Sequence, residues 1–145
     1  MNDDYPVGRG VFKEENSNFA ILVNFEDHIE IVMSPSYKNL VPSLNSLKRL
    51  MKAFEKIGFA NDAYLGYLTV NPLFLGTGLR LNTTFANLSK TEDDCESLMN
   101  RYNVRACLTE DECGVILESS VTLSSNYTET HQICEFFEGM QALCR

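Results

Sequence analysis

Residues 19–33 read FAILVNFEDHIEIVM, and this stretch decides the fold class. Its first part, 19–24, is a run of β-branched and aromatic residues, which is typical of a strand. Residues 28–33 then alternate in character, so that Ile29 and Ile31 share one face, as in a half-buried strand. Because only the short turn 25–27 separates the two segments, we predict an antiparallel β-hairpin.

Three helices are expected after this hairpin. Apolar residues recur over 40–57 with the period of a helix, Asn39 suits the N-cap, and Gly58 suits the C-terminal stop. The stretch 91–102 starts with a capping signature and acidic residues, which predicts a second helix. A third helix is expected over 128–143. Its predicted apolar stripe is Ile133, Phe136, Phe137, Met140 and Leu143.

Strands are also expected at 64–70, 79–85 and 114–118, with a loop over 71–78. Strands mixed with helices and joined by tight hairpins predict an α+β fold, an antiparallel sheet flanked by helices. The chain has 145 residues, with neither an internal repeat nor a linker-like segment, so we expect one domain over 1–145.

Composition excludes several classes of function. Acidic residues outnumber basic ones by 20 to 12, for a formal charge of −8, which opposes general nucleic-acid binding. The sequence has no run of 18 apolar residues and no signal-peptide pattern, so we expect no membrane partner and a cytoplasmic protein. The five cysteines include no Cys-x-x-Cys pair and are expected to be reduced thiols. A zinc site built from Cys107, Cys113, His131 and Cys134 fits no usual ligand spacing, so we expect no metal site.

Two short motifs carry potential chemistry. Residues 75–80, LGTGLR, combine glycines, which let backbone N–H groups point into a concave nest, with an arginine that can pair with phosphate. Residues 24–28, NFEDH, place two carboxylates and an imidazole in one hairpin turn. Taken alone, the first motif is more often an ordinary turn and the second a solvated hairpin tip.

Three motifs in order change this interpretation. Residues 5–12 (YPVGRGVF), 23–31 (VNFEDHIEI) and 66–80 (GYLTVNPLFLGTGLR) resemble the phosphagen kinases, the ATP:guanidino phosphotransferases that include arginine kinase and creatine kinase. The similarity runs from Asp4 to the last helix. The resemblance implies the later part of that family's glutamine-synthetase-like catalytic domain, with the small N-terminal helical domain absent. It also implies transfer of the γ-phosphoryl group of Mg-ATP to a guanidino compound.

The resemblance also implies site residues. Glu26 falls on the family's substrate carboxylate, and Glu110 on a further guanidinium carboxylate. Nucleotide contacts fall on the following residues: Arg80, Leu81, Asn82, Thr83, Thr84 and Arg105. Mg-ATP or Mg-ADP and a guanidino compound are the partners this implies.

Three departures from the family pattern reduce the expected activity. Glu30 stands where the family has a phosphate-binding arginine, Asn71 where it has its reactive cysteine, and Phe74 where it has an asparagine. Each lost donor to a developing charge costs about 2.7–4 kcal/mol, so we expect this kinase-like chain alone to be weak or inactive. Three hypotheses stay open: a minimal enzyme completed by a second chain, a pseudokinase or interaction module whose exposed sheet binds another protein, and a decaying gene copy.

Overall fold

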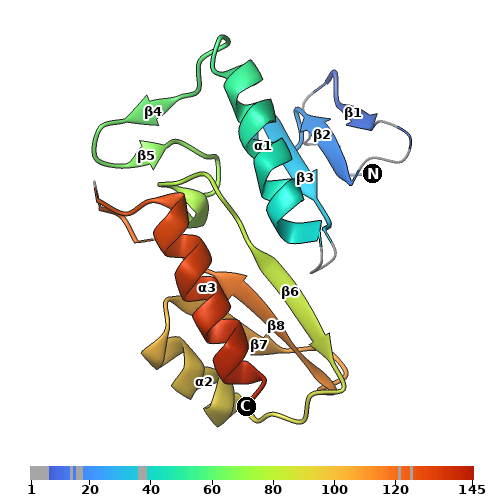
Figure 1. Cartoon of the computed structure of the whole chain (residues 1–145), viewed down its shortest axis with the longest axis vertical. Helices are drawn as coiled ribbons and strands as arrows, with labels where there is room; N and C mark the ends of the chain where they lie inside the picture. The colour runs from blue at the N-terminus through green and yellow to red at the C-terminus, as the bar shows by residue number, and fades with distance from the viewer. Residues whose placement is uncertain (1–6, 14, 16–17, 36–38, 121, 125) are drawn as a thin grey trace. The chain divides into compact units, whose positions relative to one another are not determined.

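The computed structural model describes residues 7–13, 15, 18–35, 39–120, 122–124 and 126–145. The chain divides into two compact units, Met1–Phe59 (unit 1) and Ala60–Arg145 (unit 2). Both contain antiparallel strands and helices, so the α+β class is confirmed (Figure 1). The single domain expected over 1–145 stays a prediction.

Unit 1 contains an antiparallel sheet of order β1-β2-β3. Its strands are β1 (Gly10–Lys13), β2 (Phe19–Val23) and β3 (Ile29–Met33). The predicted hairpin is confirmed, because β2 and β3 pair from Phe19 with Met33 to Val23 with Ile29. Strand β1 was not predicted.

The helix of unit 1, α1 (Leu40–Phe54), begins directly after Asn39, as predicted. Gly58, four residues beyond its end, has a φ of 79°, a backbone conformation that glycine adopts without strain. The apolar stripe of α1 is half-buried, and Val41 and Ile57 at its two ends are exposed. Among the described residues of unit 1, no apolar side chain is fully buried. The described part of unit 1 therefore lacks a dry hydrophobic core.

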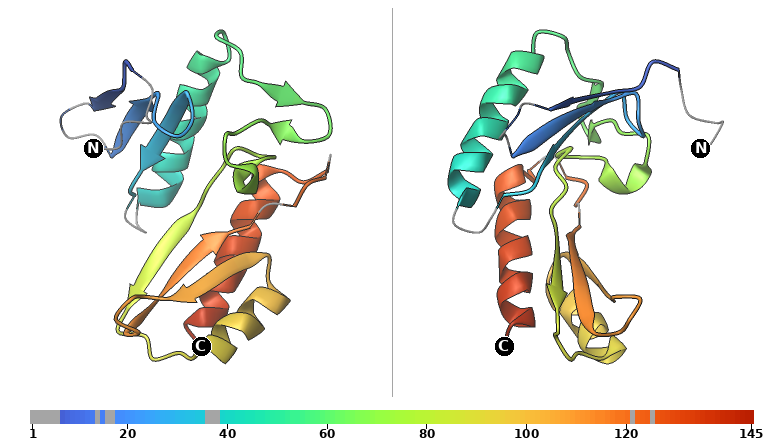
Figure 2. Two further views of the ribbon diagram at one scale, coloured as in Figure 1. Left: turned by 180° about the vertical axis from the view of Figure 1, so that it is seen from behind. Right: turned by 90° about the vertical axis from the view of Figure 1, so that its right-hand side faces the viewer.

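Unit 2 contains a two-stranded and a three-stranded antiparallel sheet, the latter of order β6-β8-β7. Its elements are, in order, β4 (Asn61–Asp62), β5 (Gly66–Tyr67), a 3₁₀ helix (Pro72–Phe74), β6 (Asn82–Ala86), α2 (Glu92–Arg101), β7 (Val104–Leu108), β8 (Gly114–Ser119) and α3 (Glu129–Leu143). Figure 2 shows α3 running along one face of the three-stranded sheet. Among the described helices of the chain, none combines the length and the apolarity that crossing a bilayer requires.

Unit 2 holds the hydrophobic core. The core joins α2 and α3 to the inner face of β7 and β8, and its buried members are Cys95, Leu98, Val104, Ala106, Val115, Leu117, Phe136 and Leu143. Helix α2 is fixed at its start by a capping box, in which Thr91 and Asp94 satisfy each other's backbone N–H groups. The helix predicted over 91–102 is thus confirmed together with its cap.

Three details of unit 2 differ from the sequence-based expectations. The strand expected at 64–70 is only the two-residue β5, which pairs with an unpredicted β4. The strand expected at 79–85 starts later, at Asn82, and β7 was not predicted. The buried face of α3 is also displaced by one position from the predicted stripe, because Gln132 and Gly139 are buried. A Cβ on Gly139 would lie 3.0 Å from Val104 Cγ1, so the glycine allows α3 to approach β7 closely.

Candidate functional site

The turn of the β2–β3 hairpin carries Glu26, the expected substrate carboxylate. The turn closes with a hydrogen bond from Asn24 N to His28 O of 3.0 Å, and Asn24 has a φ of 56°. Glu26 itself is exposed at the tip. The structure thus places this carboxylate where a solute can reach it.

Glu30 has a local structural role in the same turn. Its Oε1 accepts hydrogen bonds from the backbone N–H groups of Glu26, at 3.1 Å, and Asp27, at 3.3 Å. An arginine at this position would have no acceptor for these two donors. Glu30, which stands where the family resemblance expects an arginine, therefore stabilises the turn that carries Glu26.

The glycine loop of 75–80 is clamped to β5. Tyr67 N donates to Gly76 O at 2.7 Å, and Gly76 N donates back to Tyr67 O at 3.3 Å. A Cβ at Gly66 would collide with the Gly76 carbonyl, so this close approach requires glycine. Leu79 N donates to Thr77 Oγ1 at 3.2 Å. Two of the N–H groups expected to form an anion nest are thus used within the protein.

Arg80 projects from the end of this loop onto an aromatic ring. Its guanidinium carbon lies 3.8 Å from the centroid of the Phe74 ring, a cation–π arrangement. Phe74 occupies the position where the family resemblance expects asparagine. The departure therefore gives Arg80 a defined contact.

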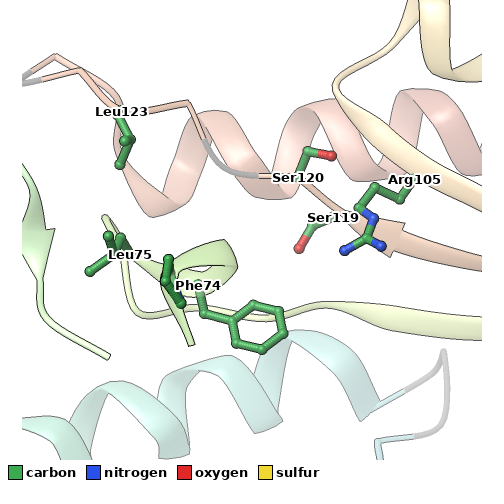
Figure 3. Close-up of a pocket in the computed structure, with 7 residues that line it drawn as sticks. Phe74, Leu75, Arg105, Ser119, Ser120 and Leu123 are labelled. Atoms are coloured by element: carbon green, nitrogen blue, oxygen red, sulfur yellow. The ribbon is translucent and has the colours of Figure 1, made fainter. Parts of the chain in front are cut away.

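Phe74 also lines a pocket of about 210 Å³ that contains Arg105. Figure 3 shows Arg105, Ser119 and Ser120 facing Phe74 and Leu75 across it. The complete lining is Pro72, Phe74, Leu75, Arg105, Ser119, Ser120 and Leu123. The pocket thus combines one cation and two hydroxyl-bearing residues with apolar walls, a composition that suits an anionic group attached to a flat or apolar body.

Strand register brings Arg105 into a row with two polar residues. Asn82 on β6 and Arg105 on β7 both pair with Glu118 on β8, so the three share the sheet face opposite the core. Arg105 Nη1 lies 4.0 Å from Glu118 Oε2, and the two side chains are 54% and 30% exposed. Glu118 therefore places a negative charge beside the cation of the pocket.

The other expected nucleotide residues divide between the two faces of the sheet. Leu81 and Thr83 lie on the core side of the β6 line, and Leu81 packs against the core cluster. Asn82 and Thr84 are exposed on the opposite side. Alternation along the strand therefore leaves Asn82 and Thr84 accessible from the face that carries Arg105.

Glu110 is not brought to the pocket. It is exposed in the turn between β7 and β8, beyond the end of β7 that lies away from Arg105, and it does not line the pocket. Thr109 Oγ1 and Cys113 N donate hydrogen bonds to Asp111, and these bonds lower the pKa of the Asp111 carboxyl. The turn is thus ordered by Asp111, and Glu110 projects from it.

Asn71 directly precedes the 3₁₀ helix that carries Phe74. Its carbonyl accepts hydrogen bonds from Thr69 Oγ1, at 2.8 Å, and Phe74 N, at 3.0 Å. The five cysteines carry free thiols. Among the described residues, no three His, Cys, Asp or Glu side chains group together as metal ligands.

Sequence inspection missed Gln132. A glutamine in an amphipathic helix is usually solvent-exposed, yet this one is 1% exposed and hydrogen-bonded to the glycine loop. The available signal was its place at helical spacing from Phe136 and Leu143, which sets it on the buried face.

Comparison with known proteins explains why these features occur together. The sequence profile of the ATP:guanido phosphotransferase C-terminal catalytic domain matches residues 1–141. The chain belongs to the ATP:guanido phosphotransferase family. It is 31% identical to arginine kinase Oct f 2 of Amphioctopus fangsiao over 157 aligned positions, and 30% identical to an arginine kinase of Turbo cornutus over 152.

The similarity extends to solved structures. The duplicated taurocyamine kinase of Schistosoma mansoni, solved with bound transition-state analogue components, matches with a TM-score of 0.77 and 26% identity. That match covers 97% of this chain and 20% of the other. The two sequence matches likewise cover 99% of this chain but only 43% of the Amphioctopus enzyme and 42% of the Turbo enzyme. It thus spans less than half the length of these guanidino kinase relatives.

Proposed function

We propose that this family member binds the phosphate groups of Mg-ATP or Mg-ADP through Arg80 and Arg105. We further propose that its phosphoryl transfer to a guanidino compound is weak or absent when the chain acts alone. The observation that supports a nucleotide site is the position of the Phe74 ring. It lines the same pocket as Arg105 and contacts the guanidinium of Arg80. Both phosphate-binding candidates thus lie near the Phe74 ring, Arg80 in contact with it and Arg105 across the pocket that it lines.

The chemistry of the site fits binding better than transfer. Phosphoryl transfer depends on positioning and on cations around the charge that spreads over the phosphoryl oxygens. Two arginines can bind a diphosphate, but Glu118 lies beside one of them and Glu30 replaces a third cation of the family. Loss of a single preorganised donor lowers the rate by about 10²–10³. Glu26 is our candidate for holding the guanidinium, with Glu110 assigned only by family resemblance.

The nucleotide proposal can be tested by calorimetry with Mg-ADP. Arg80→Met and Arg105→Met should each weaken binding, because each removes a charge-assisted contact to phosphate. Arg101→Met is the matched control, since it removes the same charge from the exposed end of α2. In a thermal unfolding assay, Mg-ADP at 100 times its dissociation constant should stabilise the protein by about 2.7 kcal/mol. Absence of binding at millimolar Mg-ADP would refute the proposal.

Transfer can be measured separately with a coupled ATP assay. Arginine, creatine and taurocyamine are suitable acceptors, because each carries a guanidino group. We expect a rate at least about 10⁵ below that of a full-length arginine kinase assayed in parallel. A comparable rate would show that the departures at Glu30 and Asn71 do not limit catalysis.

The alternative function is a non-catalytic interaction module, and one observation favours it. Unit 1 has no fully buried apolar side chain among its described residues, and Val11 and Phe12 on the edge strand β1 are 58% and 63% exposed. Exposed apolar edge strands tend to pair with another chain. Under this alternative, Phe12→Lys should abolish co-purification of a partner or self-association, measured by light scattering, and should leave Mg-ADP affinity unchanged.

A further inference from the structure

The amide of Gln132 connects α3 to the glycine loop. Gln132 Oε1 accepts a hydrogen bond of 2.5 Å from Thr77 Oγ1, and Nε2 donates to Leu79 O at 2.8 Å and to Ser119 Oγ at 2.9 Å. Both donor hydrogens and one acceptor site of the amide are therefore used. These partners precede Gln132 by 55, 53 and 13 residues, so the contacts are tertiary.

Further hydrogen bonds, between Ser119 and Leu81, hold the backbone on the other side of Arg80. Ser119 Oγ accepts from Leu81 N at 3.0 Å, and Ser119 N donates to Leu81 O at 2.8 Å. The backbone is thus held on both sides of Arg80, at Leu79 by Gln132 and at Leu81 by Ser119. The clamp of Gly76 to Tyr67 fixes the start of the same loop.

Burial makes this network costly to remove. Gln132 is 1% exposed, so the groups around its amide form hydrogen bonds with it and not with water. Removing its amide takes one donor from the Leu79 carbonyl and one from Ser119 Oγ, and it takes the acceptor from the Thr77 hydroxyl, all in a part-buried environment. Loss of hydrogen-bond partners at such sites is unfavourable. The loop is then expected to relax toward solvent.

We propose that Gln132 is a positioning residue for the nucleotide site, fixing residues 77–81 so that Arg80 projects toward phosphate from a defined place. This inference rests on the proposed role of Arg80 in nucleotide binding. Gln132 touches no substrate under this proposal. Its effect is transmitted by the loop backbone.

The test compares three variants of the full chain. Gln132→Met keeps the side-chain length and removes the amide, and Thr77→Val removes one loop hydroxyl and leaves α3 intact. Leu143→Ala is the control, because it cuts a core side chain of the same helix that is 1% exposed and belongs to no loop contact described above. The readouts are the Kd of Mg-ADP and amide hydrogen exchange at Leu79 and Leu81, whose N–H groups donate to Thr77 Oγ1 and Ser119 Oγ.

We expect Gln132→Met to speed exchange at both amides about tenfold relative to the core strand β8, and to raise the Kd about tenfold, equal to about 1.4 kcal/mol. Thr77→Val should act in the same direction with a smaller effect, and it carries the test if Gln132→Met does not fold. Leu143→Ala should lower global stability without a selective change in the loop.

Two results would overturn the inference. The first is that Gln132→Met has the same loop exchange rates and the same Kd as the unsubstituted protein. The second is that Leu143→Ala speeds exchange in the loop as much as Gln132→Met does. If the unsubstituted protein binds no Mg-ADP, the proposed function fails. In that case the exchange measurement still decides whether Gln132 fixes the loop.

Discussion

Glu118→Gln should tighten Mg-ADP binding about fivefold under the proposed function. Glu118 lies between Asn82 and Arg105 on the open face of the β6-β8-β7 sheet, and its carboxylate is 4.0 Å from the guanidinium. A bound phosphate must compete with this carboxylate for Arg105 and is also repelled by it. Glutamine keeps the shape and removes the charge.

The magnitude follows from the distance and the exposure. Two unit charges 4 Å apart interact by about 1 kcal/mol in water and about 4 kcal/mol at an effective dielectric constant of 20. With side chains 54% and 30% exposed, solvent screening keeps the interaction near the lower limit, at about 1 kcal/mol or less. That energy corresponds to a change of about fivefold in Kd.

Calorimetry of Mg-ADP binding at low and high salt is the appropriate assay. The gain should shrink as salt rises, because exposed charges are screened within about 10 Å at 0.1 M ionic strength. Glu96→Gln is the control, since it makes the same change in net charge on an exposed position of α2. Equal gains in both variants, or no gain in Glu118→Gln, would refute the reasoning.

Other perturbations test the fold. Glu30→Arg should lower the free energy of unfolding by about 0.5–1.5 kcal/mol in urea titrations, because two turn N–H groups exchange their carboxylate acceptor for water, whereas Glu30→Gln should have a small effect. Leu117→Ala, in the core, should cost about 2–5 kcal/mol in the same assay. Hydrogen bonds from Thr91 lower the pKa of Asp94 in the folded protein. The contribution of the Asp94 carboxylate to folding stability is therefore complete above about pH 4 and is lost as the pH falls through the lower folded pKa. Circular dichroism should show this loss of stability in the natural protein and not in Asp94→Asn. Finally, hydrogen exchange should be faster in β2 than in β8, since only unit 2 has a dry core among the described residues.

Local sequence signals were enough for the elements that have strong periodicity or caps. The alternation of 28–33 and the capping signature at Thr91 each describe interactions within a few residues, and both were confirmed. Strand β7 was missed although Val104, Ala106 and Leu108 alternate with more polar residues, because the run has only five residues and its pairing partner β8 is separated from it in sequence. Strands of two residues, such as β4 and β5, leave too little sequence for any period to be read.

The candidate site shows a similar division. Family motifs pointed to Arg80 and Arg105 as candidates, but the contact of Arg80 with Phe74 and the pocket that Phe74 shares with Arg105 depend on tertiary structure. The motif reading also treated Glu30 as a simple loss of charge, whereas the structure gives its carboxylate two backbone donors in the turn. Gln132 was missed because a polar residue on a buried helix face makes sense only once its distant partners are known.

The link between Gln132 and Thr77 has a consequence for how chain length affects the glycine loop. A protein that ended before residue 132 would keep the whole sequence of residues 75–80, and a motif search would still find the glycine loop. It would nevertheless lose the amide that fastens this loop from 55 positions downstream. For members of this family shortened at the C-terminus, integrity of the loop should therefore be judged by the presence of the last helix as well as by the motif itself.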